Sequence, residues 1–130
     1  MTPISWSSRR LKRVVKSTLA AETLAQVAAV ETAYWIATII QEVLWDSKHK
    51  LPYIECRTDS RSLFENAQSL KPVLDKRLRV DIAIVHQMLE KGELQKILWV
   101  EKEKQLADPL TKRGVSSNQL LQVIADGKLQ

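Results

Sequence analysis

Alternation of apolar and polar residues predicts strands at Ile4–Ser7 and Leu94–Val100, as in strands with one buried face. Tyr53–Thr58 is predicted to be a third strand. Apolar residues at helical spacing predict a helix over Val80–Lys91, with Val80, Ile84, Val85 and Met88 or Leu89 facing inward. Strands that alternate with helices are typical of an α/β fold with a short mixed sheet.

A much longer helix is predicted between the first two strands, from Ser17 or Thr18 to Leu44 or Trp45. At 100° per residue, four apolar residues fall within about 40° of Glu22, and three polar residues fall near the opposite side. The apolar row is Ala29, Ala33, Ile36 and Ile40, and the opposite residues are Glu31, Thr38 and Glu42. We expect the apolar row, with alanines 25, 29 and 33, to pack closely on a sheet.

Glu22 stands at the head of that apolar row. A glutamate aligned with a core-facing row needs a metal ion, a base or a cation nearby. The alternative is an exposed Glu22 that the positive end of the helix dipole stabilises. Both interpretations remain open at this point.

Turn and capping residues divide the rest of the chain. Asp59 and Ser60 are expected to cap a short helix that ends near Ala67, and Lys71–Arg79 is expected to be a basic loop. Gly92 is expected to end the helix before it. Further on, Asp108-Pro109 resembles an N-cap and first helical residue, Ser117 to Ala125 is the last helix, and Lys48–Lys50 is a turn.

Composition indicates one domain with a packed core, because 130 residues with 45% hydrophobic content suffice for both. The single cysteine, Cys56, excludes an intramolecular disulfide and is expected to act as a small buried hydrophobe. The stretch Ala25–Trp45 is a poor membrane span because Gln26, Glu31, Gln41 and Glu42 interrupt it. We therefore expect no membrane partner and a cytoplasmic or nuclear location.

The net charge of +5 favours a polyanionic partner, although a solubilising surface gives the same sign. Two basic segments are candidates for contact with phosphates, with a solvated surface as the alternative. Their residues are Arg9, Arg10, Lys12, Arg13 and Lys16, then Lys76, Arg77 and Arg79. Four tryptophans are expected in the core, with stacking on bases as the alternative: Trp6, Trp35, Trp45 and Trp99.

Three acidic residues are the candidate chemical site. Glu22 begins a helix, Asp59 ends a strand, and Asp108 lies in the segment Gln105-Leu106-Ala107-Asp108-Pro109-Leu110-Thr111-Lys112. Asp59 can also serve as an N-cap. Carboxylates delivered from a helix start, a strand end and a late helix start can converge on divalent ions, as metal-assisted phosphodiester hydrolysis requires.

These segments together resemble the ribonuclease H domain that ends the polyprotein of copia-type retrotransposons. The resemblance covers nearly the whole chain, and its most specific part is the Ala-Asp-Pro-Leu-Thr-Lys segment at residues 107–112. Further matching segments are Ile4–Arg10, Ser17–Glu22, Thr58–Ser60, Val80–Glu93 and Leu98–Val100.

The resemblance implies a ribonuclease H-like mixed sheet with flanking helices, in one partial domain over residues 1–130. In the family, four carboxylates hold two Mg²⁺ or Mn²⁺ ions; Glu22, Asp59 and Asp108 would be the catalytic and metal-binding residues here. The family's first aspartate and first two strands have no counterpart in this sequence. That absence predicts an exposed edge on the Tyr53–Thr58 strand, and a further hypothesis moves Ile4–Ser7 into the vacant central position.

The function implied is metal-dependent hydrolysis of RNA in RNA–DNA hybrids, with the upstream reverse transcriptase part of a longer polyprotein as a possible partner. Because a bridging carboxylate is missing, we expect weakened ion binding and little or no activity from this chain alone. The alternatives are a non-catalytic remnant that binds nucleic acid and a protein-interaction module. An integrase-type nuclease shares the general fold, but the Ala-Asp-Pro-Leu-Thr-Lys ending disfavours it.

Overall fold

The computed structural model describes residues 4–12, 14–44, 50–69 and 71–127. It is mixed α/β, mostly helical, with a small sheet of two parallel strands. The chain forms two compact units, one of Val15–Trp99 and one that joins Met1–Val14 to Val100–Gln130. The α/β class predicted from the sequence is thus confirmed, with a parallel pair of strands in place of a wider mixed sheet.

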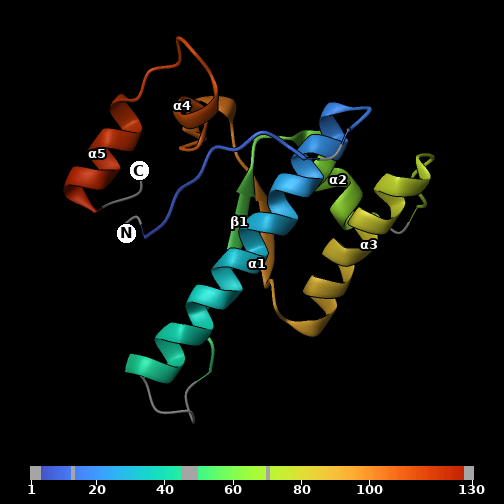
Figure 1. The fold of residues 1–130 in the computed structure, drawn as a ribbon, viewed down its shortest axis with the longest axis horizontal. Coiled ribbons are helices and arrows are strands. Elements are labelled where there is room, and N and C mark those ends of the chain that lie inside the picture. The colour runs from blue at the N-terminus through green and yellow to red at the C-terminus, as the bar shows by residue number, and fades with distance from the viewer. Residues whose placement is uncertain (1–3, 13, 45–49, 70, 128–130) are drawn as a thin grey trace. The chain divides into compact units, whose positions relative to one another are not determined.

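The unit Val15–Trp99 contains three helices and both strands (Figure 1). Strand β1 pairs with β2 in parallel, with Cys56 opposite Ile97. A parallel pair requires a long crossover, and α2 and α3 provide it here. The bounds are α1 Thr18–Leu44, β1 Glu55–Thr58, α2 Arg61–Gln68, α3 Lys76–Lys91 and β2 Lys96–Trp99.

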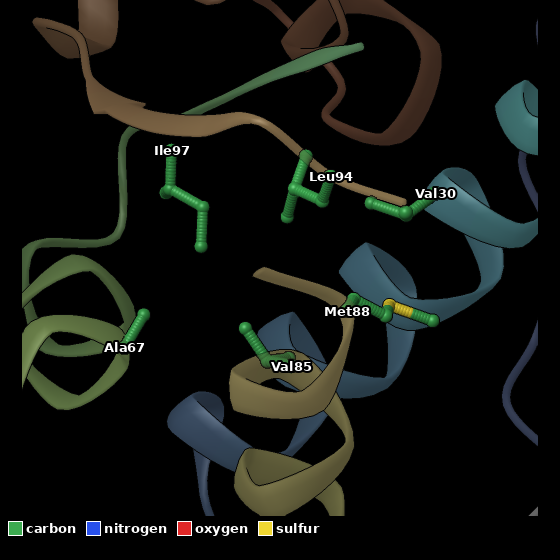
Figure 2. Close-up of a cluster of buried hydrophobic side chains, with 6 residues drawn as sticks. All are labelled: Val30, Ala67, Val85, Met88, Leu94 and Ile97. Atoms are coloured by element: carbon green, nitrogen blue, oxygen red, sulfur yellow. The ribbon is translucent and has the colours of Figure 1, made fainter. Parts of the chain in front are cut away.

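Two hydrophobic clusters hold this unit together. The larger cluster draws side chains from three helices and from β2 with the turn before it (Figure 2). Its buried members are Val30, Ala67, Val85, Met88, Leu94 and Ile97. In the smaller cluster, Ala20 of α1 packs with Leu63, Leu78 and Ile82, so the first turns of α1 and α3 lie at the same end of the unit.

The second unit has only short elements. They are the 3₁₀ helix η1 Lys102–Lys104, α4 Asp108–Thr111 and α5 Asn118–Asp126. Among its described residues, Asp108 and Val123 are the buried ones. Such a small buried set gives this unit a much weaker hydrophobic core than Val15–Trp99 has.

The extent of the long predicted helix is confirmed by α1, which runs without interruption, but the predicted buried face is wrong. Its buried residues are Ala20, Thr23, Gln26, Val30 and Ala37, a row turned by roughly 90° from Glu22. Ala25 and Ala29 are exposed, whereas Glu31 and Glu42 are exposed as predicted. The prediction failed because α1 packs mainly on α3. The buried residues of α1 are largely small or polar, and a search for large apolar side chains does not find them.

The predicted strand at Ile4–Ser7 is wrong, since residues 4–12 have no regular structure. Ile4 and Trp6 are exposed, so the alternating pattern has no sheet face to cover. The hypothesis that Ile4–Ser7 fills a central position beside β1 is therefore wrong as well. In the described chain β1 pairs only with β2, which leaves its other edge open, as expected.

The basic loop predicted at Lys71–Arg79 is wrong in its second half, because α3 begins at Lys76. Asp75 is the N-cap, and its carboxylate accepts hydrogen bonds from the backbone N–H groups of Arg77 and Leu78 at 2.8 and 3.3 Å. The predicted inward face is confirmed at Val85 and Met88 and is wrong at Val80. Leu78, Asp81, Ile82, Val85 and Met88 are buried, whereas Val80 is exposed and Ile84 is half-buried.

Smaller boundary differences concern the caps. Ser60, not Asp59, caps α2, through a hydrogen bond from the Leu63 N–H to Ser60 Oγ. The N-cap before Asp108 is Ala107, so Asp108 is the first helical residue. Gly92 ends α3 with a φ of 73°, a conformation that glycine adopts without strain, as predicted. The turn predicted at Lys48–Lys50 lies largely outside the described residues.

By length and composition, α1 is also long and apolar enough to cross a membrane, contrary to the poor span expected. Core helices of soluble proteins pass the same test. Here α1 packs against α2 and α3 along one side. The second half of α1 extends away from those helices and exposes Trp35, Ile39 and Val43 (Figure 1).

Candidate functional site

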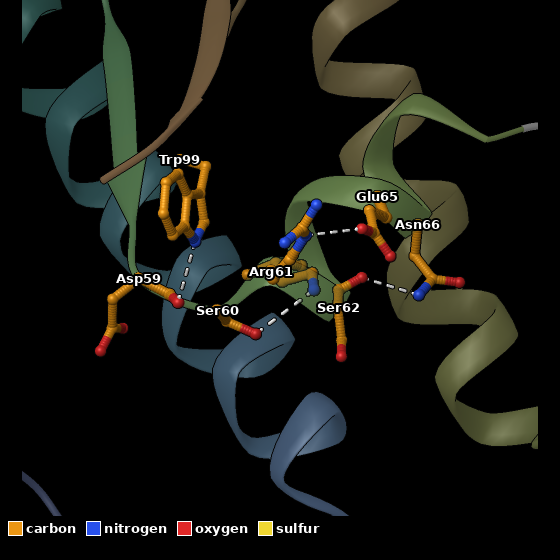
Figure 3. A network of polar contacts seen from close by, with 8 residues as sticks. Asp59, Ser60, Arg61, Ser62, Glu65, Asn66 and Trp99 are labelled. Carbon is orange, nitrogen blue, oxygen red and sulfur yellow. Dashed lines mark hydrogen bonds and ion pairs between the residues drawn. The ribbon is translucent and has the colours of Figure 1, made fainter. Parts of the chain in front are cut away.

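Asp59 directly follows β1, at the carboxyl end of the parallel pair. The indole N–H of Trp99, the last residue of β2, donates a hydrogen bond of 3.3 Å to the backbone carbonyl of Asp59 (Figure 3). The carboxylate of Asp59 points away from the indole ring and is half-buried. Ligands of α/β proteins gather at this end of parallel strands, so the fold presents Asp59 where a ligand would bind.

Glu22 lies one turn into α1 and is half-buried. Two side chains order this end of the helix: Ser17 Oγ accepts a hydrogen bond from the Ala20 N–H, and the Thr23 hydroxyl donates to the Leu19 carbonyl. Glu22 therefore sits on a well-defined helix start, at the edge of the buried row and not within it.

Asp108 is buried, and a lysine one helical turn later neutralises its charge. The ammonium of Lys112 lies 2.8 Å from Oδ1 and 2.8 Å from Oδ2 of Asp108. The side chain of Asp108 is 10% exposed, and that of Lys112 is 44% exposed. Both carboxylate oxygens thus already contact a cation, which the sequence analysis did not foresee.

The three candidate carboxylates do not form a metal centre within either unit. Glu22 and Asp59 belong to the unit Val15–Trp99, and Asp108 belongs to the other. Across residues 4–12, 14–44, 50–69 and 71–127, no group of three His, Cys, Asp or Glu side chains is placed to hold a metal ion. Within the described parts of each unit, Asp108 contacts Lys112 and no set of carboxylates is assembled for two divalent ions, so the metal centre stays a prediction.

Four basic residues of the unit Val15–Trp99 define what we call the basic surface: Lys16, Lys76, Arg77 and Arg79. All four are exposed, and three lie in the first turn of α3. Backbone N–H groups of Leu78 and Arg77 hold the pKa of Asp75 below its usual range, with a smaller contribution from the Lys16 and Arg77 charges. Lys16 thus lies close enough to the start of α3 to act together with its cations.

The remaining basic residues of the two predicted segments lie outside the basic surface. Arg9, Arg10 and Lys12 are exposed and belong to the second unit, and Arg13 lies outside the described residues. On the basic surface, the Arg79 guanidinium donates two hydrogen bonds, of 3.0 and 2.9 Å, to the Val73 carbonyl. Arg79 therefore also holds the segment before α3 in place.

The expectation that the tryptophans pack in the core is wrong for the three that are described. Trp6, Trp35 and Trp99 are 68%, 65% and 45% exposed, and Trp45 lies outside the described residues. Trp99 combines an anchored indole N–H with an exposed ring beside Asp59, which leaves a ring face available for stacking.

Cys56 behaves as expected from the sequence. It is partly buried against the larger hydrophobic cluster, and burial raises the pKa of its thiol to about 11. A thiol with such a pKa is almost fully protonated at neutral pH and is a poor nucleophile.

One residue of the site and one residue of the core were missed in the sequence. Lys112 lies four residues after Asp108, a spacing that places opposite charges together on a helix, so the signal was present. Gln26, in the core, has both side-chain polar atoms buried with no hydrogen-bond partner among the described residues. No sequence pattern identifies a buried amide without a hydrogen-bond partner, because only the packing of the folded chain determines it.

Comparisons with protein-family models, curated proteins and solved structures give no match for this chain.

Proposed function

We propose that the chain is a ribonuclease H-like domain of a copia-type retrotransposon Pol polyprotein whose 130 residues alone bind nucleic acid with little or no hydrolysis of RNA–DNA hybrids. The observation that carries the proposal is the local setting of three carboxylates. Glu22 lies at a helix start, Asp59 directly follows a strand, and Asp108 begins a short helix within the family-like segment of residues 107–112. These are the settings that the resemblance implies for them.

Weak hydrolysis by these 130 residues follows from the setting of Asp108. Both of its carboxylate oxygens contact the Lys112 ammonium, so a divalent ion has to compete with that ammonium for them. Loss of a metal contact would lower transition-state stabilisation by several kcal/mol. Binding of Mg²⁺ or Mn²⁺ is accordingly weak in this proposal.

Binding to nucleic acid is supported by the basic surface. The Asp75 carboxylate already accepts the first N–H groups of α3, and Lys76, Arg77 and Arg79 follow it in the first turn. With Lys16, these exposed cations outnumber Asp75 at this end of the helix. The resulting excess of positive charge suits phosphates.

Anisotropy of a labelled RNA–DNA hybrid at several salt concentrations tests this binding. Replacing Lys16, Lys76 and Arg77 by Gln should weaken binding and reduce the slope of log K against log salt by up to about 3, since each phosphate contact contributes about 0.9. Arg79 is kept because it bonds Val73. The matched control replaces Lys50, Lys91 and Lys96, which are exposed elsewhere, by Gln. An equal effect of both triple variants would reject the basic surface as the binding site.

A protein-interaction module is the second candidate, and the exposed apolar residues of α1 favour it. Trp35, Ile39, Val43 and Leu44 are all exposed, and β1 has an open edge. In that case the partner is the upstream reverse transcriptase part, and binding to it is insensitive to salt. A pull-down with that part, repeated with Trp35→Gln and Ile39→Gln, distinguishes the two candidates.

A further inference from the structure

We propose that the exposed face of α1 is a docking site for an amphipathic helix of a partner protein, and that lysine or arginine residues border the apolar side of that helix. The inference rests on the second candidate function, binding to a protein, and adds the chemistry of the partner. It does not depend on binding to nucleic acid, which the basic surface would carry instead.

The exposed face of α1 carries an apolar stripe made of Ala28, Trp35, Ile39 and Val43. At 100° per residue, these four residues fall within about 80° of one another. Trp35 is 65% exposed and Val43 is 73% exposed. Thr32 falls within the same stripe, and its hydroxyl donates a hydrogen bond of 2.9 Å to the Ala28 carbonyl. The polar group of Thr32 is therefore already bonded within the helix, and the stripe can be covered without leaving it unsatisfied.

The position of the stripe suits a second helix. Gln26, Val30 and Ala37 are buried against the rest of the unit, and at 100° per residue the stripe lies on the opposite side of α1. The second half of α1 extends away from α2 and α3 (Figure 1). Apolar residues that recur every three or four positions on one helix form a row against which another helix packs. A partner helix can thus cover the stripe without displacing any contact of the buried side.

The charges beside the stripe determine which helix fits. Glu31 and Glu42 are exposed and fall about 20–40° beyond one edge of the stripe. In total α1 has three glutamates and no lysine, arginine or histidine, although the whole chain has a net charge of +5. Charged residues beside an apolar helix seam pair across it with opposite charges and set the choice of partner. The stripe therefore suits a helix with basic residues beside its apolar row.

The same charges disfavour the other occupants of an exposed apolar helix face. A second copy of α1 would bring only acids towards Glu31 and Glu42, and like charges repel. Helices that lie on a membrane surface carry lysine and arginine beside their apolar residues, and α1 has neither. Burial of the stripe supplies most of the affinity, and the two glutamates select among helices.

Fluorescence anisotropy of two labelled peptides with the 130-residue chain tests the proposal. Each peptide is about three heptads long with leucine along one face, and the flanking positions are lysine in one peptide and glutamate in the other. The lysine peptide should bind the unaltered chain. Trp35→Gln should weaken this binding at least about tenfold, because aromatic anchors dominate the binding energy of such contacts. Ile39→Gln, a second exposed position of the stripe, should weaken it as well.

A charge exchange tests the selectivity. Replacing Glu31 and Glu42 by Lys should shift the ratio of the two peptide affinities towards the glutamate peptide, because each attractive pair becomes a repulsive one. The matched control replaces Glu90 and Glu103, which are exposed elsewhere, by Lys and changes the net charge equally. The shift with Glu31 and Glu42 should exceed the shift in the control at least about tenfold.

Three results would overturn the proposal. The first is binding of the lysine peptide that neither Trp35→Gln nor Ile39→Gln weakens, and the second is an equal shift in the charge exchange and its control. The third is a concentration-dependent dimer in sedimentation velocity that Trp35→Gln abolishes, since a second copy would then cover the stripe. The peptides contain no reverse transcriptase sequence, so failure of this test is distinguishable from failure of the pull-down with that part.

Discussion

At the scale of single residues, Gln26 departs most clearly from the rules of protein interiors. Its side-chain oxygen and nitrogen are both buried without a hydrogen-bond partner in the described structure. It lies on α1 between Thr23 and Val30, which are also buried. An unsatisfied buried amide costs about 1–3 kcal/mol, so this position reduces the stability of the unit Val15–Trp99.

Gln26→Met removes the amide and keeps the side-chain volume. We expect the free energy of unfolding in urea to rise by about 1–2 kcal/mol, because the orphaned polar atoms disappear while the packing stays. Gln68→Met, at an exposed position at the end of α2, is the control and should change the free energy of unfolding by less than about 0.5 kcal/mol. Destabilisation by Gln26→Met would mean that the amide has a partner in solution.

Cys56 shows how burial sets reactivity. Its thiol pKa is raised by burial from 9.0 to about 11, whereas in the unfolded chain the thiol keeps its ordinary pKa. Between these two values the unfolded chain binds fewer protons than the folded one, so stability falls as pH rises. The contribution is complete below pH 9.0 and is lost as pH approaches about 11.

The pH dependence can be isolated by comparing the chain with Cys56→Ala. The difference in unfolding free energy between the two should change by about 2–3 kcal/mol at most between pH 8 and pH 11, because each pKa unit corresponds to 1.36 kcal/mol. Lysine and tyrosine titrations occur in both proteins and cancel. A difference that does not vary with pH would show that the folded thiol titrates normally.

At the scale of elements, the sequence correctly predicted the features that depend on local signals, such as helical spacing and helix-ending residues. The extent of α1 and the end of α3 at Gly92 were predicted correctly, since helical spacing and a glycine C-cap are local signals. The buried face of α1 was predicted wrongly, because it depends on where α3 packs against it. The strand at Ile4–Ser7 was wrong because alternation stabilises a strand only when another strand pairs with it.

Capping at α2 offers a test at this scale. Ser60 Oγ accepts a hydrogen bond from the Leu63 N–H, and Leu63 is in the smaller hydrophobic cluster. Ser60→Ala should therefore lower the unfolding free energy by about 1 kcal/mol. Ser62→Ala, exposed in the first turn of α2, is the matched control and should have little effect. An equal loss of unfolding free energy in Ser60→Ala and Ser62→Ala would exclude Ser60 as the cap.

At the scale of the whole molecule, residue types predicted the α/β class and the kinds of element that carry the candidate carboxylates. Glu22 and Asp59 lie in one unit and Asp108 in the other, so the convergence of the three on divalent ions stays a prediction. The decisive contact is Lys112 on Asp108, a pairing whose strength depends on the burial of Asp108 and not on spacing alone. The basic surface likewise depends on the fold, because Lys16 is distant from α3 in the sequence and acts on Asp75, the N-cap of α3, only in the folded chain.

The central claim is that the chain binds nucleic acid without cleaving it. The most direct test mixes the folded 130-residue chain with a labelled RNA–DNA hybrid and Mg²⁺, and follows anisotropy and RNA length in the same sample, beside Asp59→Asn. We predict salt-dependent binding with intact RNA in both proteins. Cleavage that Asp59→Asn abolishes, or no binding at low salt, would contradict the account.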